Sequence, residues 1–125
     1  MDQTKREEFW NTLTHFIGIV LSLISLPLLI FANNNLSSFS LASILFFEFG
    51  LLFVYISSTL YHYVENVELK KKLRTLDHIS IFYLIAGSYA PVCLITLYND
   101  SGIGVFVAVL AIMFIGTFFK LFYTG

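Results

Sequence analysis

Four long apolar stretches divide the chain, and short polar segments separate them. The stretches cover residues 14–32, 39–63, 77–98 and 102–123. A helix needs about 20 residues to cross the ~30 Å of hydrocarbon in a bilayer, and each stretch is about that long. The stretches are continuously apolar and do not alternate between apolar and polar residues, which argues against the strands of a membrane barrel. The pattern therefore predicts an all-α integral membrane protein with four transmembrane helices.

The polar segments between these stretches are short connectors. They cover residues 33–38, 64–76 and 99–101, and they contain Asn, Ser and Asp residues that favour chain reversal. Short connectors between long spans predict an antiparallel four-helix bundle. We expect residues 1–125 to form a single transmembrane domain.

The composition supports a place in the bilayer and excludes other classes of protein. The chain is 58% hydrophobic and only 12% charged, with a mean hydropathy of +0.83, so a soluble fold would have too little polar surface. The net charge of −1 gives no reason to expect a nucleic-acid partner. The single cysteine, Cys93, excludes an internal disulfide and is expected to serve in packing.

The basic residues predict the orientation of the chain in the cell membrane. With four crossings, all of them fall on the same side: Lys5, Arg6, Lys70, Lys71, Lys72, Arg74 and Lys120. By the positive-inside rule this side is cytoplasmic. We therefore expect the amino terminus to be cytoplasmic.

Polar residues recur on one face of the first two spans. On the first span the spacing of three and four places a stripe of small and polar residues on one helical face: Asn11, His15, Gly18, Ser22 and Ser25. On the second span Glu48, Tyr55 and His62 are spaced by sevens. Such residues indicate contact with other helices rather than with lipid. Glu48 lies ~21 Å along the helix from His62 and is either a protonated packing residue or a polar element of a cavity.

Three chemically capable side chains lie at the predicted cytoplasmic edge. Ser58 and His62 are one helical turn apart, and Asp77 opens the next span. A serine hydrolase would need an oxyanion hole that no other residue suggests. A zinc site is better motivated, because imidazole is a preferred ligand and a carboxylate can orient water, although further protein ligands are needed. Anchoring at the level of the lipid headgroups, or simple interhelical hydrogen bonding, remains the alternative for the histidines. His78 points about 100° away from its neighbour Asp77.

Three motifs in this order resemble those of the hemolysin III family, the bacterial branch of the progestin and adipoQ receptor group. The motifs are EEFWNTLTHFIG at residues 7–18, STLYH at 58–62, and LDHISIF at 76–82 running on to AGSYAP at 86–91. The family is also similar at its site residues to membrane ceramidases. The resemblance covers nearly the whole chain.

The resemblance implies roles for individual residues. Ser58 and His62 match the second-helix serine and zinc-ligand histidine, and Asp77 matches the third-helix aspartate that holds zinc-bound water. Asn11 and His15 match the first motif, whose role is less settled. Family members resemble a seven-helix bundle whose last helix carries two more zinc histidines as His-xxx-His, and this chain has no such pair. We therefore expect the first four helices of such a bundle, with an incomplete zinc site.

Two classes of function follow from the resemblance. The first is a zinc-dependent hydrolase acting on a membrane lipid amide, if the missing helices are supplied by self-association or by a carboxyl-terminal half. The second is a non-enzymatic membrane protein, either receptor-like or pore-forming and cytolytic, in which the same residues only hold the helices together.

Overall fold

The computed structural model describes residues 4–123 and is all-helical over that range. The four long helices are α1 (Lys5–Ala32), α2 (Ser40–Tyr63), α3 (Val67–Pro91) and α4 (Gly102–Phe122), and a π-helical turn, η1 (Val92–Thr96), continues α3. All four are long and apolar enough to cross a membrane. The predicted fold class, an all-α membrane protein with four transmembrane helices, is confirmed.

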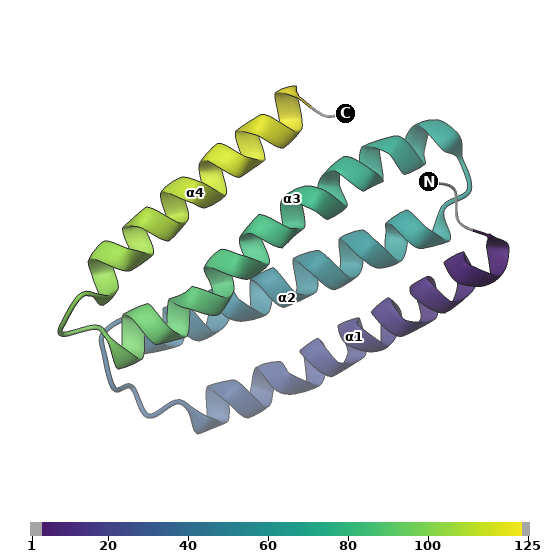
Figure 1. The fold of residues 1–125 in the computed structure, drawn as a ribbon. Helices are drawn as coiled ribbons and strands as arrows, with labels where there is room; N and C mark the ends of the chain where they lie inside the picture. Colours follow the sequence, from purple (N-terminus) through teal and green to yellow (C-terminus); the bar gives the residue numbers. More distant parts are fainter. Residues whose placement is uncertain (1–3, 124–125) are drawn as a thin grey trace.

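The helices lie in a row that follows their order in the chain (Figure 1). Each helix packs antiparallel against the next, and within the described residues α1 makes no backbone contact with α4. The neighbours are antiparallel, as the short connectors predicted, and the four described helices form an open row in which α1 and α4 do not meet. We call the end where α1 and α3 begin and α2 and α4 end the basic end, because all seven lysines and arginines lie near it.

Two of the helices begin before the apolar stretches that predicted them. Thr4 starts α1 with a capping box, in which its hydroxyl accepts a hydrogen bond from the Glu7 N–H at 3.1 Å and the Glu7 carboxylate accepts one from the Thr4 N–H at 3.0 Å. The Asn66 side chain caps α3 by accepting from the Leu69 N–H at 3.0 Å. The segment 64–76, expected to be a connector, is therefore mostly helix. Both caps place polar residues on ordered helical turns at the basic end.

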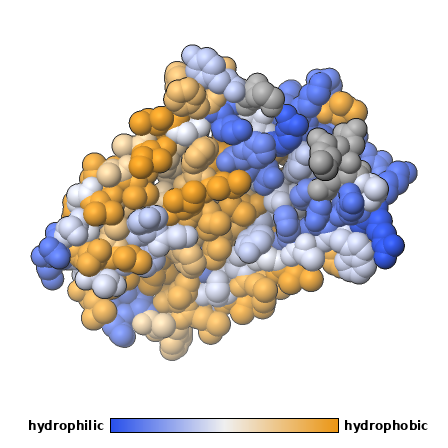
Figure 2. All heavy atoms as spheres, viewed as in Figure 1, coloured by the Kyte–Doolittle hydropathy of each residue, from blue (hydrophilic) through white to orange (hydrophobic). Residues whose placement is uncertain are grey.

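The interior of the row is rich in small and polar side chains, while large apolar side chains face outward. Buried polar residues are as numerous as buried apolar ones among the described residues, and they include five serines in α2 and α3: Ser40, Ser43, Ser57, Ser58 and Ser80. Phe31, in contrast, is 93% exposed. Figure 2 shows a broad apolar surface, with hydrophilic atoms gathered at the basic end. This distribution is the one expected of helices that pack through small residues and face lipid.

Helices α2 and α3 approach each other most closely, at two glycines. A Cβ atom on Gly50 would lie 2.9 Å from the Tyr83 carbonyl oxygen, and one on Gly87 would lie 3.0 Å from the Phe46 carbonyl oxygen. At these distances any side chain would force the two backbones apart, so glycine is favoured at both positions. The two helices therefore form a tightly fixed pair at the centre of the row.

The far end of α3 contains the cysteine. Cys93, in η1, is 1% exposed and packs with Ala90 and Leu94 against Phe46 and Phe106. The expected packing role of Cys93 is confirmed, and it is a free thiol.

Candidate functional site

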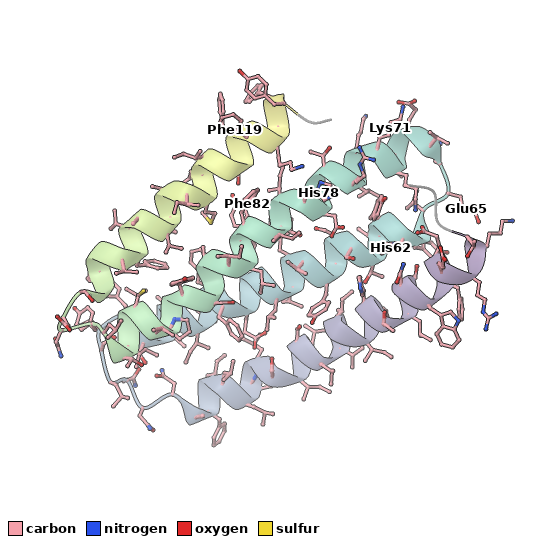
Figure 3. All side chains as sticks on the ribbon, in the orientation of Figure 1. His62, Glu65, Lys71, His78, Phe82 and Phe119 are labelled. Carbon is pink, nitrogen blue, oxygen red and sulfur yellow. The ribbon has the colours of Figure 1, made fainter. Side chains whose placement is uncertain are left out.

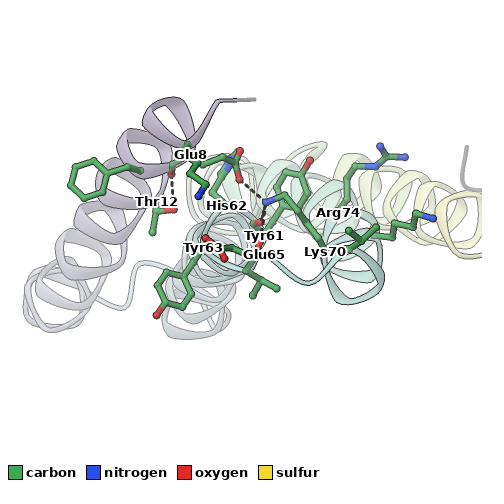
Figure 4. Close-up of a pocket in the computed structure, with 13 residues that line it drawn as sticks. Glu8, Thr12, Tyr61, His62, Tyr63, Glu65, Lys70 and Arg74 are labelled. Carbon is green, nitrogen blue, oxygen red and sulfur yellow. Dashed lines mark hydrogen bonds and ion pairs between the residues drawn. The ribbon is translucent and has the colours of Figure 1, made fainter. Parts of the chain in front are cut away.

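A carboxylate that the sequence did not single out joins three helices at the basic end. Oε1 of Glu8, on α1, lies 3.1 Å from Nδ1 of His62 on α2. Its Oε2 accepts a hydrogen bond from Nζ of Lys70 on α3 at 2.5 Å. The three side chains are only 11–28% exposed, so water screens these contacts less than it would at an open surface. Figure 4 shows Glu8 with these two partners.

Lys70 also closes the end of α2. Its ammonium group donates to the carbonyl oxygens of Tyr61 at 2.5 Å and Val64 at 3.2 Å, and it lies 4.6 Å from the centre of the Tyr61 ring. An ammonium group has three donors, and three acceptors surround this one. Lys70 therefore stabilises the α2 C-terminus, where carbonyl groups lack helical partners, and fixes the position of Glu8.

The contact with Glu8 sets the chemistry of His62. A carboxylate that accepts a hydrogen bond from Nδ1–H leaves the lone pair of a neutral imidazole on Nε2. The same pairing of a carboxylate with the far nitrogen orients many histidines that bind metals. His62 is thus held in one orientation and, when neutral, presents Nε2 as a metal ligand or proton acceptor.

The second histidine of the site belongs to α1. His15 Nδ1 is hydrogen-bonded to the hydroxyl of Ser58, which is 5% exposed. The rings of His15 and His62 lie edge to face with centroids 5.4 Å apart. The carboxylate of Asp77, on α3, is within electrostatic range of both imidazoles. The structure therefore brings His15, Ser58 and His62 into one cluster, with Asp77 close enough to act on it through its charge.

Other predicted residues lie beside this cluster or outside it. Asn11 is on α1 one turn before His15 and shares its face. His78 follows Asp77 but belongs to the α3–α4 side, where its Nδ1 lies 3.2 Å from Nζ of Lys120. Figure 3 labels both His62 and His78. The expected divergence of His78 from Asp77 agrees with this contact.

Glu48 lies deeper in the row, at the contact between α1 and α2. It is 2% exposed, and its Oε1 accepts a hydrogen bond from the Ser25 hydroxyl at 2.5 Å. Its Oε2 has no hydrogen-bond partner among residues 4–123. Glu48 is therefore an interhelical contact separate from the cluster around His62.

The donor set does not complete a metal site. Within the part of the chain that the structure describes, no three His, Cys, Asp or Glu side chains are grouped so that they could hold a metal ion. The described residues fit one ligand position, His62, together with the carboxylate that orients it.

The comparison with known families decides the identity of the chain. The model of haemolysin-III-related proteins matches residues 3–124. The chain belongs to this family. The resemblance inferred from the three motifs is confirmed.

Relatives in the haemolysin-III-related family are longer than this chain. It is 38% identical over 121 residues to the hemolysin-3 homolog of Bacillus subtilis (strain 168), an alignment that covers 96% of this chain and 57% of the relative. It is 32% identical over 124 residues to hemolysin-3 of Bacillus cereus, covering 98% of this chain and 57% of that protein. No solved structure matches the chain. The chain thus spans little more than half the length of the curated relatives it matches.

Glu8 and Lys70 are the site residues that the sequence analysis missed. A signal for Glu8 was present, because Thr4 and Glu7 form a readable capping-box pattern that extends α1 and places Glu8 seven residues before His15 on the same face. Lys70 gave no such signal, since a run of three lysines next to an apolar stretch is explained by membrane orientation alone. Only the packing of three helices shows that this lysine turns inward.

Proposed function

We propose that the cluster at the basic end is part of a zinc-dependent hydrolase site that acts on a membrane lipid amide. His62 serves as a zinc ligand, Asp77 orients the attacking water, and Ser58 assists through its hydrogen bond with His15. The remaining zinc ligands come from outside residues 4–123. The observation that carries this proposal is the contact of His62 with Glu8, because a carboxylate on the far nitrogen is the usual support of a metal-binding imidazole.

The roles of the protein groups follow from their positions. Glu8 holds His62 in place, and Lys70 holds Glu8 by a hydrogen bond of 2.5 Å. His15 is hydrogen-bonded to the Ser58 hydroxyl and lies next to His62, so it can pass a proton to or from a reacting group. Zinc, when bound, supplies Lewis acidity that polarises a carbonyl group and activates water.

Zinc binding tests the ligand role of His62 in protein purified at the full length of its relatives. We expect zinc titration, followed by the histidine signals in NMR spectra, to perturb His62 first. His62→Ala should abolish the saturable binding, and Glu8→Gln should weaken it at least about tenfold because it removes the supporting carboxylate. His78→Ala is the matched control and should bind as the unchanged protein does. Equal zinc affinity in His62→Ala and His78→Ala would refute the ligand role.

Turnover tests the hydrolase role. In membranes that contain the protein at the full length of its relatives, we expect hydrolysis of a lipid amide that is lost in His62→Ala and in Asp77→Ala at unchanged protein levels. Hydrolysis that persists without His62 would mean that this cluster is not the active site.

A pore-forming function is the second candidate, and the names of the two relatives, hemolysin-3 and its homolog, favour it. The physical argument against it is that the buried polar residues are few and already engaged. Glu48 and Ser58 bond to side chains of α1, and the hydroxyls of Ser22, Ser43 and Ser80 bond to carbonyl groups of their own helices. A water-filled channel needs a sustained polar lining. Dye leakage from vesicles that survives His62→Ala would favour the pore over the hydrolase.

We also infer that the basic end faces the cytoplasm, which places the amino terminus inside the cell. The gathering of all lysines and arginines at that end supports this orientation. In a Cys93→Ser background, Lys72→Cys should react with a membrane-impermeant thiol reagent only after the cells are opened. Labelling of intact cells would reverse the assignment.

A further inference from the structure

Glu48 lies at mid-depth among residues that offer it no positive charge. Residues 16–60, in α1, α2 and their connector, and residues 79–119, in α3, η1 and α4, contain no lysine, arginine or histidine. Within these ranges the other titratable side chains of α2, α3 and η1 are hydroxyl and thiol groups: Tyr55, Tyr83, Tyr89 and Cys93. An ionised carboxylate buried in hydrocarbon without a cation is costly. The surroundings therefore favour a neutral Glu48.

The hydroxyl of Ser25 contacts two acceptors but has one hydrogen. It lies 2.5 Å from Oε1 of Glu48 and 2.9 Å from the carbonyl oxygen of Ser22. A hydroxyl group donates only one hydrogen, so it cannot fully serve both acceptors when Glu48 is ionised. A proton on Glu48 reverses the bond between the two side chains: the carboxyl group donates to Ser25, and Ser25 donates to Ser22. Both contacts are then hydrogen bonds, and the geometry provides a place for one proton.

The second carboxyl oxygen of Glu48 also fits the neutral form better. Oε2 has no hydrogen-bond partner among residues 4–123, and the whole side chain is 2% exposed. In a carboxylate this oxygen would carry part of a negative charge with no donor near it. In a carboxylic acid it is a neutral carbonyl oxygen, and a neutral group without a partner costs less than a charged one.

A pocket of about 420 Å³ approaches Glu48 from the end of the row opposite the basic end. Its lining includes Asn33 in the α1–α2 connector, and Leu29 and Ile44 on the two helices. Leu29 lies one turn beyond Ser25 on α1, and Ile44 lies one turn before Glu48 on α2. We call it the far-end pocket. It brings the surface of that end to within about one helical turn of the carboxyl group.

Helices α1 and α2 are packed closely on the other side of Glu48. Between Glu48 and the cluster around His62, the ring of Tyr55 lies against Gly18 and leaves no room there for a Cβ atom. The far-end pocket is therefore the open approach to Glu48, and the cluster at the basic end is separated from it by this contact.

We propose that Glu48 is a proton-binding site that exchanges its proton through the far-end pocket. With its proton bound, Glu48 donates to Ser25 and joins α2 to α1 at mid-depth. This contact then responds to acidity on the side of the membrane opposite the basic end. The inference goes beyond the proposed function, since it requires neither zinc nor hydrolysis.

Infrared spectroscopy detects this proton, because the C=O stretching band of a carboxylic acid lies apart from the bands of a carboxylate. The protein, at the full length of its relatives and in lipid vesicles at neutral pH, should show an acid band that Glu48→Gln removes. Glu68→Gln, which removes an exposed carboxylate, is the control and should keep this band. Ser25→Ala should shift the band because the acid loses its acceptor. Ser88→Ala, which removes a hydroxyl bonded within α3, should not.

Deuterium exchange tests the route of the proton. Transfer to heavy water shifts the acid band at the rate at which Glu48 exchanges its proton. Leu29→Trp fills part of the far-end pocket and should slow this shift several-fold. Leu28→Trp is the matched control, since Leu28 is 64% exposed and does not line the pocket, and it should exchange as the unchanged protein does. Circular dichroism of each variant confirms that the helices are intact.

Three results would overturn the proposal. The absence of an acid band that depends on Glu48 would mean that the group is a carboxylate. An acid band that stays in place in Ser25→Ala would mean that Glu48 does not donate to Ser25. Equal exchange rates in Leu29→Trp and Leu28→Trp would mean that the proton does not pass through the far-end pocket.

Discussion

Helix α2 is held to α1 and to α3 in two different ways. On the α1 side the contacts are pairs of polar side chains, and they run from the basic end to mid-depth: Glu8 with His62, His15 with Ser58, and Ser25 with Glu48. On the α3 side the contacts are made by backbones that meet at Gly50 and Gly87. Lipid offers no hydrophobic drive for helix association, so both polar contacts and close packing are needed.

The two kinds of contact have different roles: one sets the positions of the helices, and the other also supplies the chemical groups of the site. A glycine contact fixes the distance between two backbones and presents no functional group. A polar contact holds helices together and also presents atoms that can react or bind. The residues with reactive or ligand-binding side chains are accordingly concentrated on the α1–α2 side. Helix α3 adds Asp77 and Lys70 from a backbone that the glycines hold in place.

Removal of a polar contact between α1 and α2 should have the largest effect on the stability of the fold. Glu8→Ala leaves Lys70 and His62 without their carboxylate, so we expect a loss of about 2 kcal/mol in the free energy of unfolding. This is below the 3–5 kcal/mol typical of fully buried pairs, because these side chains are partly exposed. Reversible unfolding in mixed micelles of detergent and dodecyl sulfate measures the loss.

The matched control for Glu8 is the carboxylate of Glu68, which pairs with Lys71 on an exposed surface. Glu68→Ala should change the unfolding free energy by less than about 0.5 kcal/mol. If the two variants unfold alike, the contacts of Glu8 contribute no more than a surface pair.

A substitution at a glycine contact between α2 and α3 should have a smaller effect on stability. In Gly50→Ala the new methyl group meets the Tyr83 carbonyl oxygen and the Leu84 Cα atom at 2.9 and 3.0 Å, and overpacking of this kind costs 1–3 kcal/mol. Alanine regains part of this through its higher helix propensity, so we expect a net loss of about 1 kcal/mol in the same unfolding assay. Gly104→Ala isolates the propensity, because nothing lies within 4 Å of its Cβ. A Gly50 variant as stable as the Gly104 variant would contradict close packing of α2 and α3.

The smallest effect on stability is expected for the polar contact between α1 and α2 at mid-depth in the membrane. Ser25→Ala removes the hydrogen bond to Glu48, and interhelical hydrogen bonds in membranes average about 0.6 kcal/mol. Ser88→Ala is the control, since the Ser88 hydroxyl bonds only to the Leu84 carbonyl group of its own helix among the described contacts. Unfolding free energies that fall equally in both variants would show that the Ser25–Glu48 contact does not join the helices.

The length of the apolar stretches made the fold predictable from the sequence, whereas the site was predictable only in part. Apolar length alone determines that four helices cross a membrane, and the caps at Thr4 and Asn66 could have corrected where α1 and α3 begin. Helical periodicity placed Ser58 and His62 on one face. No pattern within a single helix specifies which side chains of two helices meet, so the pairing of His15 with Ser58 was not foreseen. The roles of His62, Asp77 and zinc stay predictions.

The contact of Glu8 with His62 shows the same limit. The residues are 54 positions apart, and each has a simple local explanation, as a first-turn acid that favours the helix dipole and as an interfacial histidine. Their meeting depends on the relative height of α1 and α2, which hydropathy fixes only to within a turn or so. Side-chain contacts between helices are therefore the part that needed a structure.

The row of helices also has a consequence for biosynthesis. Every described helix packs on the one made just before or after it, so the order of packing repeats the order of synthesis. A chain of this kind closes only short loops and has a low contact order, which favours rapid folding. Each new helix finds its partner already in the membrane, and the site at the basic end assembles when the third helix delivers Lys70 and Asp77 to the first two.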